Sequence, residues 1–315
     1  MNYTAVIRTL GTAGDKYQNL LKSLVLQTLQ PLKIIVYIAE GYSIPQETVG
    51  IEQYVFVKKG MVAQRALNYD EVDTEYILFL DDDLEFPPDT VEKMFRLLNE
   101  NKADVISPDI FPNAERPWKS RISMWISARM NARQNDRYWG YKVMRSAGYS
   151  YNNAPCQDVY WSQTNAGACF LCRKSDFLRI NFEEELWLDK VDYPLGEDQV
   201  MYYKMYKHGL KILTWYKHHF VHLDAGGNMY PKKKKKIIYS DFRFKIIFWH
   251  RFIYLPEKKI YLRFWDVLCI GYALGFTLGI SLLKGNISVF KLKLKAIKDG
   301  ISFLKSKAYQ QLPRI

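Results

Sequence analysis

Three carboxylates directly follow a short apolar run and form the clearest chemical signal in the sequence. The run Tyr76–Leu80 is uncharged and rich in large side chains, which is typical of a strand buried on both faces. Asp81, Asp82 and Asp83 must then lie where this strand emerges, because burying an unpaired charge is costly. Open α/β sheets bind ligands at that carboxyl edge, and clustered carboxylates suit a shared Mg²⁺ or Mn²⁺ ion. The simpler alternative is an acidic loop that caps the helix beginning near Pro87.

A second acidic pair lies much later in the chain. Glu197 and Asp198 follow Gly196 and open a helix that is predicted to run through His208. A carboxylate within about 3 Å of a hydroxyl group can take its proton during a reaction. Acidic residues in a first turn also stabilise the helix dipole, so helix capping is the alternative interpretation of this pair.

Strand-like and helix-like segments alternate from residue 3 to residue 107, and further strand-like segments follow up to residue 223. Apolar runs predict strands at residues 3–9, 32–39, 54–58, 76–80, 105–107, 167–173, 211–215 and 219–223. Helical spacing of apolar residues predicts helices at residues 15–30, 60–69 and 90–99. Alternation of this kind implies parallel strands joined by right-handed crossovers. We therefore expect a doubly wound α/β sheet with helices on both faces.

Positive charge is concentrated at the end of the chain. The whole chain carries +12, whereas residues 231–315 alone carry +15 and leave −3 for residues 1–230. We therefore predict two regions, a catalytic domain over 1–230 and a basic helical region over 231–315. A basic region of this size is expected to meet a polyanion. The neighbouring uncharged run favours an anionic membrane, and no nucleic acid partner is expected.

The basic region contains one uncharged run, Val267–Leu283. Its 17 residues are the lower limit for crossing a bilayer, and exporting the basic residues 284–315 would violate the positive-inside tendency. Apolar residues in 287–304 recur at helical steps between lysines, as in a helix that lies on anionic lipid. We expect peripheral, monotopic attachment to the cytoplasmic face of the cell membrane rather than a single span. Three glycines on one helical face would suit contact in an oligomer: Gly271, Gly275 and Gly279.

Residues 113–161 are polar and rich in aromatic side chains, with nine Trp and Tyr residues that include Trp118 and Trp125. Such rings can stack on sugars from a loop over a site, or they can serve as core residues or membrane-interface anchors. The four cysteines form no disulfide framework, which suggests a reducing compartment. Cys169 and Cys172 lie in an apolar run and are expected in a core strand. The first predicted strand begins almost at Met1, so no signal peptide is expected.

The order of these motifs resembles glycosyltransferase family 2, a group of inverting enzymes with the nucleotide-diphospho-sugar-binding GT-A fold. The resemblance covers roughly residues 3–225. Arg8 stands where this family usually has Pro, and Ala39-Glu40 replaces its usual Asp pair. The segments that match are Ala5–Thr9, Leu21–Pro31, Ile34–Val36 with Glu40-Gly41, Lys59-Gly60 with Gln64–Asn68, Tyr76–Asp83, Glu197-Asp198 and His222.

The resemblance implies metal-dependent transfer of a sugar from a nucleotide-diphosphate sugar to a glycan or lipid-linked acceptor. It implies Asp198 as the catalytic base, with Glu197 beside it. The expected metal ligands for Mn²⁺ or Mg²⁺ are Asp83, Asp81 and His222. The expected substrate and nucleotide contacts are Thr9, Glu40, Arg65, Asp81, Asp82 and Gly167.

Two other functions remain open from the sequence. A nucleotidyltransferase on a similar sheet would need a glycine-rich phosphate loop near the first strand, and Leu10–Gly14 is a poor version of one. A non-enzymatic module that binds a membrane would explain the basic region. It would leave the acidic residues at 81–83 and 197–198 without a role.

Overall fold

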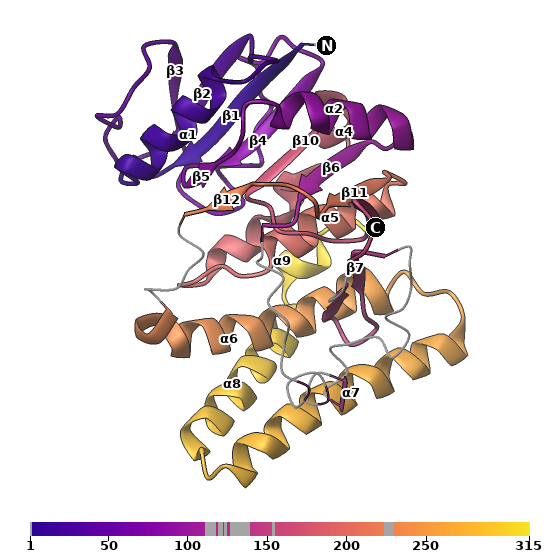
Figure 1. Ribbon diagram of the computed structural model, residues 1–315. Helices are drawn as coiled ribbons and strands as arrows, with labels where there is room; N and C mark the ends of the chain where they lie inside the picture. Colours follow the sequence, from indigo (N-terminus) through magenta and orange to yellow (C-terminus); the bar gives the residue numbers. More distant parts are fainter. Residues whose placement is uncertain are drawn as a thin grey trace.

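A central sheet of eight strands organises the molecule (Figure 1), with the strand order β3-β2-β1-β4-β10-β6-β11-β9. The computed structural model describes residues 2–110, 118, 122, 125–126, 139–152, 155–223 and 230–315. The strands are β1 (Tyr3–Thr9), β2 (Lys33–Ala39), β3 (Glu52–Val57), β4 (Tyr76–Asp81), β6 (Val105–Pro108), β9 (Val159–Ser162), β10 (Cys169–Arg173) and β11 (Ile212–Trp215).

The expected α/β fold is confirmed, but the sheet is only mostly parallel. Strands β3, β2, β1 and β4 are parallel neighbours, whereas β10 is antiparallel to both β4 and β6. Ala168 accepts a hydrogen bond from the amide of Asp81 at the carboxyl edge. The chain thus enters β10 from that edge, and an antiparallel neighbour needs no crossover helix. Strand β9 is likewise antiparallel to β11.

Helices cover both faces of the sheet, and a buried apolar cluster lies on each face. They are α1 (Asp15–Val25), α2 (Thr90–Asn101), α4 (Lys174–Leu178), the 3₁₀ helix η1 (Phe182–Lys190) and α5 (Glu197–Lys207). The helix predicted over residues 60–69 is wrong, because this segment forms turns. Two short pairs complete the body, β5 (Leu84–Glu85) with β12 (Val221–His222), and β7 (Tyr141–Val143) with β8 (Tyr149–Tyr151).

The basic region forms a helical layer beside the body (Figure 1). Its elements are α6 (Tyr230–Phe248), the π-helix η2 (Trp249–Tyr254), α7 (Ile260–Leu283), α8 (Ile287–Leu304) and α9 (Lys307–Gln310). Helices α7 and α8 form a hairpin closed by a short turn, and α8 returns along α6. Helix α7 begins before the uncharged run from which it was predicted, and the amphipathic helix predicted next is confirmed as α8.

The helical layer shares a core with the body. Phe244, Phe248 and Phe252 belong to the same buried cluster as Phe79 and Phe170 of the sheet. The predicted division of the chain at residue 230 remains a prediction, and this packing shows that the two regions are continuous in the core.

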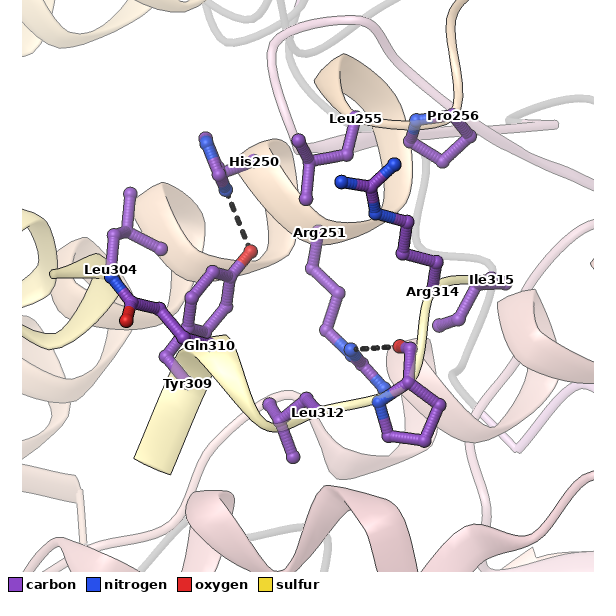
Figure 2. Close-up of a pocket in the computed structure, with 11 residues that line it drawn as sticks. His250, Arg251, Leu255, Pro256, Leu304, Tyr309, Gln310, Leu312, Arg314 and Ile315 are labelled. Atoms are coloured by element: carbon purple, nitrogen blue, oxygen red, sulfur yellow. Dashed lines mark hydrogen bonds between the residues drawn. The ribbon is translucent and has the colours of Figure 1, made fainter. Parts of the chain in front are cut away.

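The last residues of the chain close back onto η2. Arg251 donates a hydrogen bond to the carbonyl of Pro313 at 2.8 Å, and the ring of His250 lies 2.7 Å from the hydroxyl of Tyr309. Figure 2 shows His250 and Tyr309 pointing toward one another, with Arg251 beside them. These contacts surround a cavity of about 270 Å³. They hold the C-terminal residues on η2, whose Arg251 also pairs with Glu185 of η1 in the body.

Candidate active site

The acidic triad lies at the carboxyl edge of the sheet, as the sequence predicts. The register of β1 and β4 sets Arg8 beside Asp81. Arg8 Nε lies 2.5 Å from Asp81 Oδ1, and Arg8 Nη2 lies 3.1 Å from Oδ2. Burial pushes the pKa of Asp81 upward, but Arg8 outweighs burial and holds the pKa below its usual value. A two-pronged ion pair of this type fixes the carboxylate in one orientation.

Arg65 joins the two acidic motifs. Its Nη1 donates to Asp198 Oδ1 at 3.0 Å, its Nη2 donates to the carbonyl of Gly167 at 2.7 Å, and Nη2 also lies 3.5 Å from Asp81 Oδ1. A Cβ on Gly167 would lie 2.0 Å from Asp198 Oδ1 and 2.6 Å from Arg65 Nη1. Glycine is therefore required at position 167 for Arg65 and Asp198 to meet.

The turn that carries Arg65 is fixed from two sides. The carboxylate of Asp189, in η1, accepts hydrogen bonds from the amides of Val62 at 3.1 Å and Ala63 at 2.9 Å. The side chain of Gln64 donates to the carbonyl of Thr9 at 3.0 Å. The amides of Gln64 and Ala66 donate to the carbonyls of Gly60 and Val62, so the segment keeps one helical turn that does not continue to residue 69. The role of Asp189 has no local signature in the sequence, because it lies more than 100 residues away from the turn.

Glu197 and Asp198 occupy the first turn of α5 and differ in exposure. Glu197 is buried, with its Oε1 3.5 Å from Arg8 Nη2. Burial, reinforced by the neighbouring Asp198 carboxylate, raises the pKa of Glu197 to about 7. The side chain of Asp198 is 34% exposed. Asp198 is thus the member of the pair that is open to solvent.

The start of α5 is set by Gly196, which has a φ of 88°. That value lies in the left-handed region, which favours glycine. The ring of Phe244, from α6, fills the space where a side chain at position 196 would lie. Phe244 was not among the residues predicted for the site, and its contact comes from packing alone.

Asp82, Asp83 and His222 form the other side of the site. Thr9 donates a short hydrogen bond from its hydroxyl to Asp82 Oδ2. Burial raises the pKa of Asp82 to about 6, although the hydrogen bond from Thr9 lowers it. Pairing of β5 with β12 sets His222 opposite Leu84, and His222 Nε2 lies 3.1 Å from Asp83 Oδ2.

This arrangement fits a divalent cation through two protein ligands. Within the described ranges, no three His, Cys, Asp or Glu side chains are grouped to hold a metal. Asp83 and His222 converge, and Mg²⁺ is usually held by one or two carboxylates together with substrate phosphates. Asp81 is engaged by Arg8, so its role as a metal ligand remains a prediction.

Glu40 is the predicted residue that lies apart from this cluster. It follows β2 at the same edge of the sheet, its side chain is exposed, and its amide donates to the carbonyl of Val57 at 2.7 Å. Among the described residues, the side chain of Glu40 makes no contact with the other predicted site residues. Contact of Glu40 with a nucleotide therefore remains a prediction.

Comparison with known proteins identifies the family. Residues 17–154 match the family model for glycosyl transferase family 2. The chain carries a family 2 glycosyltransferase domain. The match includes Arg65 and the acidic triad, and it ends before Glu197. No curated protein sequence matches the chain.

Solved structures show the same fold as this glycosyltransferase domain at low sequence identity. TarS 1–349 from S. aureus is 13% identical at a TM-score of 0.50, over 90% of this chain and 74% of TarS 1–349. GalNAc-T7, solved with UDP, GalNAc and Mn²⁺, is 12% identical at a TM-score of 0.50, over 70% of this chain and 44% of GalNAc-T7. A longer TarS structure is 13% identical over 79% of this chain and 39% of its own length, at a TM-score of 0.45. The chain thus spans less than half of two of these three structures.

Proposed function

We propose that this protein transfers a sugar from a nucleotide-diphosphate sugar to a hydroxyl group, with inversion at the anomeric carbon. The observation that supports this proposal best is the bridge made by Arg65 between Asp81 and Asp198. It brings the acids at the end of β4 and the acids at the start of α5 to one edge of the sheet. Donor and acceptor could therefore meet between the two motifs.

Asp198 is the proposed general base. Arg65 holds its Oδ1, which fixes the orientation of the carboxylate, and its side chain is exposed enough for an acceptor to approach. A carboxylate placed in this way can take the proton of the attacking hydroxyl group. One base and one in-line displacement invert the anomeric centre. Glu197, which is buried beside Arg8, is proposed to orient Asp198 or to bind an acceptor hydroxyl.

Asp83 and His222 are the residues that would hold Mn²⁺ or Mg²⁺. Such a cation neutralises the negative charge that develops on a leaving diphosphate. The fold shared with GalNAc-T7, which was solved with Mn²⁺, supports a metal in this domain. We propose nucleotide contacts at Thr9, Glu40 and Asp82, whereas the contacts of Arg65 and Gly167 favour a role in holding Asp198.

We further propose that the enzyme acts at a membrane surface, on a lipid-linked sugar or a growing polysaccharide. Among the described residues, α7 is the one helix long and apolar enough to cross a membrane, and 17% of its most apolar stretch is buried. The charge of the basic region favours the cytoplasmic face. A Cβ at Gly271, Gly275 or Gly279 would meet no atom within 4 Å, so this face of α7 is open, and the oligomer contact expected there from the sequence is an alternative to contact with lipid.

A donor screen tests the proposed reaction. Purified protein is mixed with Mn²⁺ or Mg²⁺ and each sugar nucleotide, and release of nucleoside diphosphate is measured. One donor should be cleaved, and Asp83→Ala should abolish both cleavage and metal-dependent nucleotide binding while the circular dichroism spectrum stays native. Full activity in excess EDTA, or undiminished turnover by Asp83→Ala, would contradict the proposal. Release of pyrophosphate from a nucleoside triphosphate would identify a nucleotidyltransferase instead.

A further inference from the structure

One face of α7 consists of exposed apolar and aromatic side chains. The residues on this face are between 44% and 65% exposed and recur every three or four residues: Tyr261, Phe264, Trp265, Leu268 and Tyr272. Such spacing places them on a single side of the helix. A contiguous apolar surface of this kind marks a site that binds a protein or a membrane.

The opposite face of α7 is fastened to the rest of the protein. Asp266 is fully buried, and its Oδ1 lies 2.5 Å from Nη1 of Arg145, in the turn between β7 and β8. Lys293, from α8, donates to Ser281 Oγ at 2.9 Å. These contacts hold α7 along its length against the body and against α8. An upright single span would have to break them and leave Asp266 buried without its partner, which is costly.

A second segment adds to the exposed face of α7. The hydroxyl of Tyr272 donates to the carbonyl of Ile126 at 2.7 Å. Four side chains of this segment are between 38% and 66% exposed and fall at helical spacing: Trp118, Ile122, Trp125 and Ile126. The segment that carries Trp118 and Trp125 is therefore tied to α7 at Ile126.

The charge around this surface favours a lipid partner. Exposed lysines lie directly before α7, directly after it, and on α8: Lys258, Lys259, Lys284, Lys291, Lys295 and Lys298. Lysine is depleted from protein–protein interfaces, whereas lysine beside Trp and Tyr is typical of helices that lie in the interface of an anionic bilayer. Anionic headgroups would complement these lysines.

We propose that the exposed face of α7 and the side chains of Trp118, Ile122, Trp125 and Ile126 form one composite lipid-binding surface, with α7 lying in the plane of the membrane. This inference rests on the membrane association proposed above and names the residues that make it. It assigns Trp118 and Trp125 to membrane anchoring rather than to stacking on a sugar. It also adds a segment outside the basic region to the membrane contact.

Vesicle flotation tests the composite surface with the full chain. Vesicles of phosphatidylcholine with phosphatidylglycerol are compared with vesicles of phosphatidylcholine alone, and binding should be stronger to the anionic vesicles. Trp125→Gln and Trp265→Gln should each weaken binding about tenfold, because each removes one large apolar contact with lipid. Phe56→Gln is the matched control, since Phe56 is 49% exposed and lies on β3, far from α7 in the fold. Vesicle binding by Phe56→Gln should equal that of the parent.

Three results would overturn the inference. Trp125→Gln could bind vesicles as the parent does while Trp265→Gln fails to bind, which would remove the second segment from the surface. Trp125→Gln could raise the KM for an acceptor without changing vesicle binding, which would restore the sugar-stacking interpretation. The parent could form a dimer and fail to bind vesicles, and Trp265→Gln could lose that dimer. This result would show that the surface binds a second copy of the chain. Donor cleavage measured without lipid should be equal in all variants, so a failed surface is distinguishable from a failed transferase.

Discussion

The ring of Phe244 lies directly over Gly196, the residue that precedes Glu197 and Asp198. A Cβ at position 196 would lie 2.4 to 2.6 Å from three atoms of this ring. Phe244 belongs to α6, in the basic region, whereas Gly196 opens the helix that carries the proposed base. The C-terminal helices therefore support the geometry of the site as well as forming the proposed membrane surface.

Removing the ring of Phe244 should impair catalysis more than donor binding. Phe244→Ala leaves a cavity beside Gly196, so α5 can shift at its first turn. We expect kcat to fall about ten- to a hundredfold, because a displacement of about 1 Å at reacting groups has effects of this size. The Kd for the donor should change little, and Phe244→Leu should restore most of the rate. Steady-state kinetics and donor titration measure both quantities.

Phe248→Ala is the control for this prediction. Phe248 lies on the same helix in the same buried cluster, and truncating either ring should cost about 3–5 kcal/mol of unfolding free energy. Equal losses of kcat in the two variants, measured where both are folded, would show that Phe244 acts through general stability alone.

The ion pair between Arg8 and Asp81 should contribute measurably to the free energy of unfolding. Both side chains are mostly buried, so Arg8→Gln leaves Asp81 with only the more distant Arg65. We expect a loss of about 3 kcal/mol in the free energy of unfolding. The same change should cost much less in the Asp81→Asn background. Urea denaturation of the four proteins in this cycle measures the coupling, and equal costs in both backgrounds would contradict the ion pair.

Protonation of Glu197 should make stability depend on pH. Its pKa is raised from 4.5 to about 7 in the folded protein, so the folded form keeps a proton that the unfolded chain has lost between these values. Stability therefore falls as pH rises through this window. Between about pH 5 and about pH 8, the parent should lose more unfolding free energy than Glu197→Gln. Parallel pH profiles of the two proteins in urea denaturation would refute the raised pKa.

The packing of the last residues of the chain predicts on which side of the membrane the C terminus lies. Tyr309 is buried, and Arg251 of η2 binds both the carbonyl of Pro313 and Glu185 of η1 in the body, so the end of the chain should stay on the side of the catalytic domain. A cysteine added after Ile315, in a chain whose native thiols are replaced, should resist an impermeant thiol reagent on intact cells. It should react once the cells are permeabilised. Labelling of intact cells would instead favour a single span through α7.

The sequence predicted those parts of the site that depend on local pattern. The apolar run before Asp81 and the glycine before Glu197 each mark the end or start of one element, and the structure has both elements at these positions. The ion pair of Arg8 with Asp81 depends on the register of two strands 73 residues apart. No local pattern sets that register, so this contact could not be predicted.

Tertiary contacts accompany two of the differences between the predicted and observed elements; a third is the helix predicted over residues 15–30, which ends at Val25. Residues 60–69 have the apolar spacing of a helix, but they form only short turns, whose first amides, those of Val62 and Ala63, donate to the remote carboxylate of Asp189. Helix α7 extends beyond the uncharged run and includes the charged residue Asp266. The ion pair between Asp266 and Arg145 compensates the burial of this carboxylate. In both cases the tertiary partner is remote in sequence.

The single-turnover rate of Asp198→Asn tests the proposed mechanism most directly. This substitution keeps the shape of the side chain and removes its basicity. With the donor identified by the screen, the chemical step should slow by about 10²- to 10⁴-fold, while the Kd for the donor stays within about twofold. A collapse of donor binding with an unchanged rate in the bound complex would show that Asp198 binds substrate, and the assignment of the base would then be wrong.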